Sequence, residues 1–108
     1  MSQYSELKPG QKIVVQVDVD LEDLIPMFLS NRKREIPELK EALSKGDFEA
    51  IRVLGHSLKG VGGGYGFDAI TDLGAVLETA ARSENLPEIE QTVSQLATFL
   101  DCVEVEYI

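Results

Sequence analysis

The sequence predicts an all-α protein, an antiparallel up-down four-helix bundle with an extended N-terminal lead-in. Four segments space their apolar residues three and four positions apart, which is the period of one helix face. Only a few residues separate consecutive segments, and short connections favour antiparallel neighbours. With 108 residues, of which 44% are hydrophobic, the chain can fill one core. We expect residues 1–19 to form the extended segment and residues 20–108 to form the bundle.

The lead-in starts with ten polar residues, which we expect to be loose. Apolar residues then alternate with others from Ile13 to Val19, a pattern typical of an extended chain. The sequence offers this run no obvious partner strand, so we expect it to pack on the helices. Asp18 and Asp20 are candidate N-caps for the helix that follows.

The first helical segment keeps one apolar register over its length. The residues in that register are Leu21, Leu24, Ile25, Phe28, Leu29, Ile36, Leu39 and Leu43. Pro26 and Pro37 interrupt the segment, and Pro37 could begin a new helix because proline is accepted at the first helical position. The unbroken register instead favours one long helix kinked at Pro37. Gly46 is expected to end this helix, and Asp47 to cap the next one.

The other three helices are each marked by an apolar stripe. The second is expected from about Phe48 into a glycine-rich stretch, the third from near Asp68, and the fourth with Pro87 in its first turn. The three stripes are Ile51, Leu54, Leu58, Val61 and Tyr65; Ile70, Leu73, Leu77 and Ala80; and Ile89, Val93, Leu96, Leu100 and Val103. No internal repeat competes with this interpretation.

Charge and composition argue against several classes of function. The formal net charge of −9 disfavours binding to nucleic acid or anionic membranes, because phosphate contacts need Lys and Arg. No apolar run approaches the ~20 residues of a membrane span, and the polar N-terminus lacks the apolar core of a signal peptide. The single cysteine, Cys102, argues against a disulfide scaffold. We expect a cytoplasmic protein, and a monomer.

Glycines gather around the only histidine of the chain, His56. Six of the nine glycines lie between Gly55 and Gly66. Glycine inside a helix costs about 0.5–1 kcal/mol relative to alanine, and such exceptions tend to occur where function needs them. Two interpretations remain open. Either the helix ends near Gly60 and the later glycines form a loop, or the helix continues with one face free of side chains.

Helical geometry places His56 on the outer face of the second helix. At about 100° per residue, Arg52, Lys59, Gly60 and Gly63 lie within about 60° of His56, away from the apolar stripe. A neutral imidazole is nucleophilic near pH 7, and an ammonium group one turn away can offset the charge of a phosphoryl group. The glycines would let another protein approach. The same spacing also fits an ordinary surface histidine beside an ordinary surface lysine.

Other chemistries lack residues that they need. A metal site at His56 would need further ligands, and the chain has no second histidine and no paired-cysteine motif, so we expect none. No nucleophile elbow supports a hydrolase. A P-loop needs Gly-Lys-Ser/Thr after a strand, whereas Lys59 precedes its glycine. Residues 64–69 match a dinucleotide-binding pattern, but they follow a helical segment rather than a strand.

A stretch of 23 residues, HSLKGVGGGYGFDAITDLGAVLE, resembles the signature of the histidine-containing phosphotransfer (HPt) family. The resemblance covers roughly residues 20–104. It is carried by His56, Leu58, Lys59, Gly60, Gly66, Leu73, Leu77 and Glu78, and upstream by Leu39, Ala42, Leu43, Gly46 and Asp47. Val61, in place of a small residue, and the triple glycine Gly62–Gly64 depart from the family pattern. Neither departure removes a residue that the chemistry needs.

The resemblance implies a carrier of a two-component phosphorelay, with a four-helix bundle and an exposed phosphoacceptor histidine on the second helix. Such a protein has no autokinase activity. It accepts a phosphoryl group from a receiver-domain aspartate or a sensor kinase and passes it to another response-regulator receiver. We expect no cofactor in this chain, because the receiver contributes the Mg²⁺ ion.

The resemblance also implies roles for individual residues. His56 would accept the phosphoryl group and Lys59 would steady it, while Gly60 and Gly63 would admit the receiver. Arg52 is expected on the same partner-binding surface. Glu78 stands where some relatives place a carboxylate near the histidine, so it would either orient the ring or be an ordinary exposed helix glutamate.

An alternative function is that of a docking module, which has the same bundle and binds receivers but does not accept a phosphoryl group. A member that had lost phosphotransfer would be expected to have lost either His56 or Lys59. This chain retains both, which favours the carrier.

Overall fold

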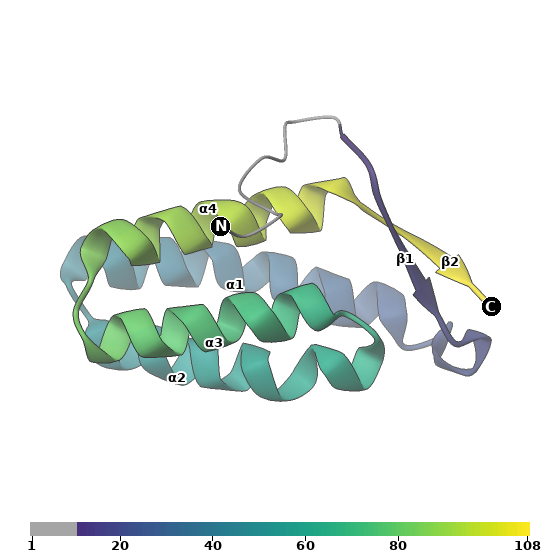
Figure 1. The fold of residues 1–108 in the computed structure, drawn as a ribbon, viewed down its shortest axis with the longest axis horizontal. Coiled ribbons are helices and arrows are strands. Elements are labelled where there is room, and N and C mark those ends of the chain that lie inside the picture. The colour runs from purple at the N-terminus through teal and green to yellow at the C-terminus, as the bar shows by residue number, and fades with distance from the viewer. Residues whose placement is uncertain (1–10) are drawn as a thin grey trace.

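A computed structural model describes residues 11–108 of the chain (Figure 1). Its elements in chain order are β1 (Ile13–Val17), the short 3₁₀ helix η2 (Val19–Leu21), α1 (Ile25–Lys45), α2 (Phe48–Val61), the 3₁₀ turn η3 (Gly63–Tyr65), α3 (Asp68–Arg82), α4 (Leu86–Cys102) and β2 (Val103–Tyr107). The four predicted helices are all present. The prediction of ten loose N-terminal residues lies outside the described residues.

The four helices lie side by side around one core (Figure 1). The contact between α2 and α3 is the most extensive between any two helices, and α1 packs on both α2 and α4. Aliphatic side chains from every helix fill the core, including Leu39, Ile51, Ile70 and Ile89, which are fully buried. Burial of each such side chain contributes about 1.5–3 kcal/mol.

The predicted boundary between the first two helices is confirmed. Gly46 ends α1 in the left-handed conformation, with φ +67°, and its N–H donates to the carbonyls of the last helical turn. The Asp47 side chain then accepts a hydrogen bond from the N–H of Ala50 and caps α2. The continuous helix predicted through Pro37 is also confirmed, since α1 has no break there.

The start of α1 differs from the prediction. The Asp18 side chain accepts from the N–H of Asp20, but it caps η2 rather than the long helix. α1 begins only at Ile25, with Pro26 in its first turn and no side-chain cap. Leu21, which was predicted in the apolar register of this helix, lies instead in the separate 3₁₀ turn, where it is partly buried against the core.

A two-stranded parallel sheet corrects the all-α prediction. β1 pairs with β2, with Ile13 opposite Val103 and Val17 opposite Tyr107. The extended lead-in therefore does have a partner strand, which lies 90 residues away in the sequence. Val103 was expected in the fourth helix, but α4 ends at Cys102. Val103 lies three residues after Leu100, which fits a helical stripe. From Val103 onward, however, partly buried and exposed side chains alternate as they do in a strand.

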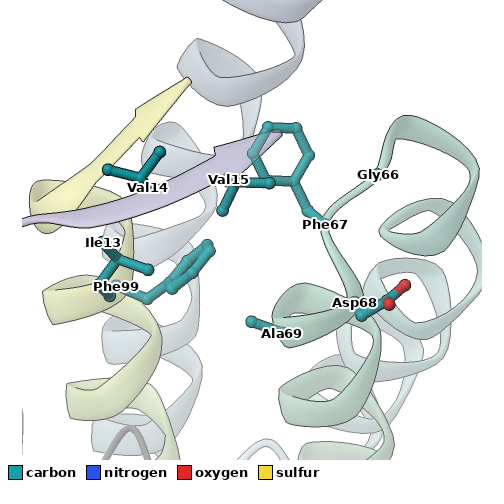
Figure 2. Close-up of a pocket in the computed structure, with 8 residues that line it drawn as sticks. All are labelled: Ile13, Val14, Val15, Gly66, Phe67, Asp68, Ala69 and Phe99. Atoms are coloured by element: carbon teal, nitrogen blue, oxygen red, sulfur yellow. The ribbon is translucent and has the colours of Figure 1, made fainter. Parts of the chain in front are cut away.

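The sheet covers the end of the bundle where α2 connects to α3 (Figure 1). A cavity of about 270 Å³ lies between β1 and the start of α3 (Figure 2). Most of the residues around it are apolar, with Ile13 and Val15 from β1, Phe67 and Ala69 from the turn and α3, and Phe99 from α4, and Asp68 also lines it. No residue of the candidate site described below lines this cavity.

Candidate functional site

The glycine-rich stretch combines features of both sequence interpretations. α2 continues one residue past Gly60 and ends at Val61, and the following glycines form the η3 turn. Thr71 of α3 holds this end of α2, because its hydroxyl donates to the Lys59 carbonyl and accepts from the Gly63 N–H, at 3.1 and 2.7 Å. His56 and Lys59 therefore both lie in the last two turns of α2, before the η3 turn leads into α3.

His56 lies on the outer side of α2. Its side chain is 69% exposed, and its Nδ1 lies 2.8 Å from Oε2 of Glu78 on α3. Within residues 11–108 the Nε2 atom has no hydrogen-bond partner. One ring nitrogen is therefore held by the protein, and the other is left for solvent or a partner.

Glu78 is the anchor of this site. Its side chain is only 6% exposed, so the alternative of an ordinary exposed helix glutamate is wrong. Oε1 accepts a hydrogen bond from Nζ of Lys59 at 3.1 Å, and Oε2 accepts a longer one from the Arg82 guanidinium at 3.4 Å. Three donors from two helices thus converge on one buried carboxylate.

The donors keep Glu78 ionised. Its pKa is lowered below the ordinary value, chiefly by the hydrogen bond from Lys59 and further by His56, while burial acts in the opposite direction. An ionised carboxylate can only accept hydrogen bonds, so the proton of a neutral His56 ring belongs on Nδ1. The lone pair of Nε2 is then directed away from Glu78.

Lys59 contributes its ammonium to the same cluster. Its side chain is 48% exposed, and its one bond to a carboxylate leaves further donors on Nζ for an incoming anion. The predicted proximity of His56 and Lys59 on one face of α2 is therefore matched by a carboxylate that both side chains share.

The other predicted surface residues differ in their surroundings. Arg52 is paired within α2, where its Nε donates to Glu49 at 3.0 Å. This hydrogen bond and the charge of Glu49 raise the pKa of Arg52, and the more distant charge of Glu78 acts in the same direction. Gly60 is exposed, and a side chain there would meet no atom within 4 Å. Gly63 is exposed too, but it lies in η3, so the helical angle predicted for it does not apply.

Arg82 was missed by the sequence reasoning. It follows Glu78 by four residues on α3, and this i, i+4 spacing is typical of an ion pair on a helix. That signal only becomes informative once Glu78 is known to face His56, since either residue alone is unremarkable on a helix surface.

Metal-ligating clusters and membrane-spanning helices are absent from the part of the chain that the structure describes. Residues 11–108 contain no group of three or more His, Cys, Asp or Glu side chains that could hold a metal ion. None of the helices described is both long and apolar enough to cross a membrane.

A family model described as Hpt domain matches residues 23–105. The chain belongs to the Hpt domain family. The match contains all four helices and every residue of the candidate site. Its general function is histidine phosphotransfer in a phosphorelay, as a phosphocarrier module that works with receiver domains or histidine kinases. No curated protein and no solved structure matches the chain.

Proposed function

We propose that this Hpt domain carries a phosphoryl group on Nε2 of His56. One observation carries the proposal: a largely exposed imidazole whose Nδ1 is bound by a buried, ionised carboxylate. This contact fixes the ring's orientation and its tautomer, which leaves the outer nitrogen as the nucleophile. Glu78 would act here as the residue that orients His56.

The transfer step follows from this arrangement. The lone pair of Nε2 attacks the phosphorus of an aspartyl phosphate on a receiver domain. An N–P bond forms as the P–O bond breaks, and the aspartate leaves as a carboxylate. The proton on Nδ1 stays in place, so the phosphorylated ring is cationic and the Glu78 carboxylate balances its charge. The reverse step on a second receiver regenerates neutral His56.

Lys59 would stabilise the phosphoryl group. The group carries negative charge on three oxygens, and a charge-assisted hydrogen bond from an ammonium is about twice as strong as a neutral one. Lys59 lies one turn beyond His56 on α2 and retains donors that Glu78 does not use. The same ammonium would therefore serve the carboxylate at rest and the phosphoryl oxygens during transfer.

The face around His56 would receive the partner. Gly60 leaves it free of a side chain, Arg52 adds a positive charge at its edge, and the exposed Gly63 in η3 stays a predicted contact of the partner. We propose that the partner is a response-regulator receiver or a sensor kinase, and that the receiver supplies the acidic pocket and its Mg²⁺ ion. This chain would need no cofactor of its own.

The test is phosphoryl transfer from a labelled receiver. The purified chain is incubated with phosphorylated receiver domains and Mg²⁺, and the protein-bound label is assayed for acid lability and base stability. Wild type is expected to gain such label, and His56→Gln to gain none. The carrier proposal fails if no receiver labels wild type, or if His56→Gln gains as much. A chain that binds receivers but stays unlabelled would be a docking module.

We also propose that the chain does not phosphorylate itself and that its helices run in an antiparallel up-down order. Incubation with ATP alone should leave the chain unlabelled, because it would have no autokinase activity. The short connections between helices support an antiparallel up-down order. The division into residues 1–19 and 20–108, the monomeric state, the absence of nucleic-acid binding and the cytoplasmic location stay predictions from the sequence.

A further inference from the structure

Two glycines outside the face that we assign to the partner lie where α2 and α3 cross. Gly55 immediately precedes His56, and Gly74 lies one turn before Glu78. Both are buried inside helices, where glycine is less favourable than alanine. Neither has the positive φ that would explain glycine by backbone conformation. Their presence therefore calls for an explanation in the contact between the helices.

Each glycine lies directly against the backbone of the other helix. A methyl group on Gly74 would come within 2.5 Å of the Lys59 backbone nitrogen and 2.8 Å of the Gly55 carbonyl oxygen. A methyl group on Gly55 would come within 2.7 Å of the Glu78 backbone nitrogen. These neighbours are backbone atoms, which cannot swing aside, so even alanine at either position would push the helices apart.

The atoms at this crossing belong to the residues of the site. The backbone nearest to the missing side chain of Gly55 is that of Glu78, and the backbone nearest to the missing side chain of Gly74 is that of Lys59. The spacing of the two helices therefore sets how far the Glu78 carboxylate lies from His56 and Lys59. The His56–Glu78 bond is 2.8 Å, and a separation of about 1 Å would carry it beyond hydrogen-bond length.

We propose that Gly55 and Gly74 are positioning residues for phosphotransfer, because their missing side chains bring α2 and α3 close enough for Glu78 to bind His56 Nδ1. The inference rests on the function proposed above. A side chain at either position would separate the helices, release the ring from Glu78 and let it adopt the Nε2–H tautomer. Nε2 would then lack the lone pair that attacks phosphorus.

The experiment compares Gly74→Ala and Gly55→Ala with wild type by ¹⁵N NMR of the His56 ring, in the absence of any phosphoryl donor. Neutral wild-type His56 is expected as the Nδ1–H tautomer, and each variant is expected to shift toward Nε2–H. Phosphotransfer should slow by between about tenfold and 100-fold in each variant. Retention of the Nδ1–H tautomer in a folded Gly74→Ala protein would overturn the proposal.

Two control variants separate positioning from general destabilisation. Gly64→Ala adds the same methyl group where no atom lies within 4 Å, and Ile70→Val removes one methylene from the core of α3. Both should keep the wild-type tautomer, although Ile70→Val lowers stability. If Ile70→Val shifts the tautomer as far as Gly74→Ala does, the glycines are only packing residues.

Glu78→Asp keeps the inference testable if the glycine variants do not fold. It preserves the charge and both glycines, but it withdraws the carboxylate by one methylene. At the same helix spacing the shorter side chain should no longer reach Nδ1 of His56, so loss of the Nδ1–H tautomer is expected. An unchanged tautomer would contradict the proposal, because the His56 bond would then not depend on the distance between the helices. Since the tautomer is read without a phosphoryl donor, a failed phosphotransfer assay would count against the carrier function alone.

Discussion

At the scale of single residues, Glu78 is what separates this site from a surface histidine. A histidine and a lysine one turn apart are common on helices, but here a buried carboxylate from α3 accepts from both. The protein tolerates this buried charge because three donors, including Arg82, form hydrogen bonds with the carboxylate oxygens. The outer nitrogen of His56 is then directed away from Glu78, and the half-exposed Lys59 ammonium lies beside it on the same carboxylate.

The ionisation of Glu78 predicts a pH dependence of stability. Its pKa is lower in the folded protein than in the unfolded chain, so its stabilising effect is complete above the ordinary value of 4.5 and is lost as pH falls through the lower folded value. Glu78→Gln should therefore remove part of the acid-induced fall in the free energy of unfolding between neutral pH and pH values below 4.5. Urea denaturation across this range measures it.

Glu41→Gln is the matched control for that measurement. The pKa of Glu41 is lowered too, by a hydrogen bond from Lys45, but this pair is exposed to solvent, which screens it. Glu41→Gln should therefore change the fall in the free energy of unfolding at acid pH less than Glu78→Gln does. An equal change in the two variants would contradict the role assigned to the buried Glu78 carboxylate.

Lys59→Ala should slow phosphotransfer by about 10- to 100-fold, because a hydrogen bond to a charged group contributes about 1.5–3 kcal/mol. The side chain is about half exposed, so the helical content is expected to stay unchanged. Stopped-flow transfer from a phosphorylated receiver measures the rate, and circular dichroism checks the fold. Lys45→Ala removes an exposed lysine from α1 and should leave the rate unchanged; equal rates in the two variants would argue against the role of Lys59.

At the scale of elements, the glycines of this chain serve different purposes. Gly46 ends α1 with a positive φ, whereas Gly62 allows the end of α2 to lie against Thr71, whose backbone nitrogen would be 2.6 Å from an added methyl group. Gly64 has neither constraint. Composition alone therefore says little about which glycines the helices require.

Gly46→Ala is expected to destabilise the fold by about 1–2 kcal/mol, the cost of the left-handed conformation for a residue with a Cβ. No atom lies within 4 Å of the added methyl group, so the cost comes from the backbone alone. Equilibrium urea unfolding measures it. Gly64→Ala, which is equally unhindered but lacks a positive φ, should not destabilise; similar losses in both variants would refute this explanation.

At the scale of the whole molecule, the two ends of the described chain meet in one parallel sheet. Val17 of β1 is buried in the core with the helices, and the N–H of Ile108 donates to its carbonyl at 3.0 Å. β1 is therefore part of the folded core. Its contacts lie beside the turn between α2 and α3, while His56 and Glu78 lie within the helices themselves.

Val17→Ala should lower the free energy of unfolding by about 2 kcal/mol, because it removes two buried carbons and leaves a cavity. Val14→Ala, on the same strand but 58% exposed, should cost much less. Thermal or urea unfolding compares the two. Neither change should alter the phosphotransfer rate under conditions where both proteins are folded. Equal stabilities would mean that the strand does not contribute to the core.

The sequence by itself determined the four helices, the cap between α1 and α2, and the outward position of His56 beside Lys59. These features depend on residues within a few turns of one another, where apolar period, capping residues and helical angle act directly. The family resemblance added the residues of the motif, and the family match over residues 23–105 agrees with it.

Only the tertiary structure decided that Glu78 is buried against His56, that Arg82 joins it, and that β1 pairs with β2. Two of these contacts join segments far apart along the chain, 22 residues for His56 and Glu78 and 90 residues for the strands, whereas Arg82 lies only four residues from Glu78 and matters because Glu78 faces His56. No local pattern specifies such a distance. It follows from how closely the helices pack, and in α2 and α3 that closeness depends on the missing side chains of Gly55 and Gly74.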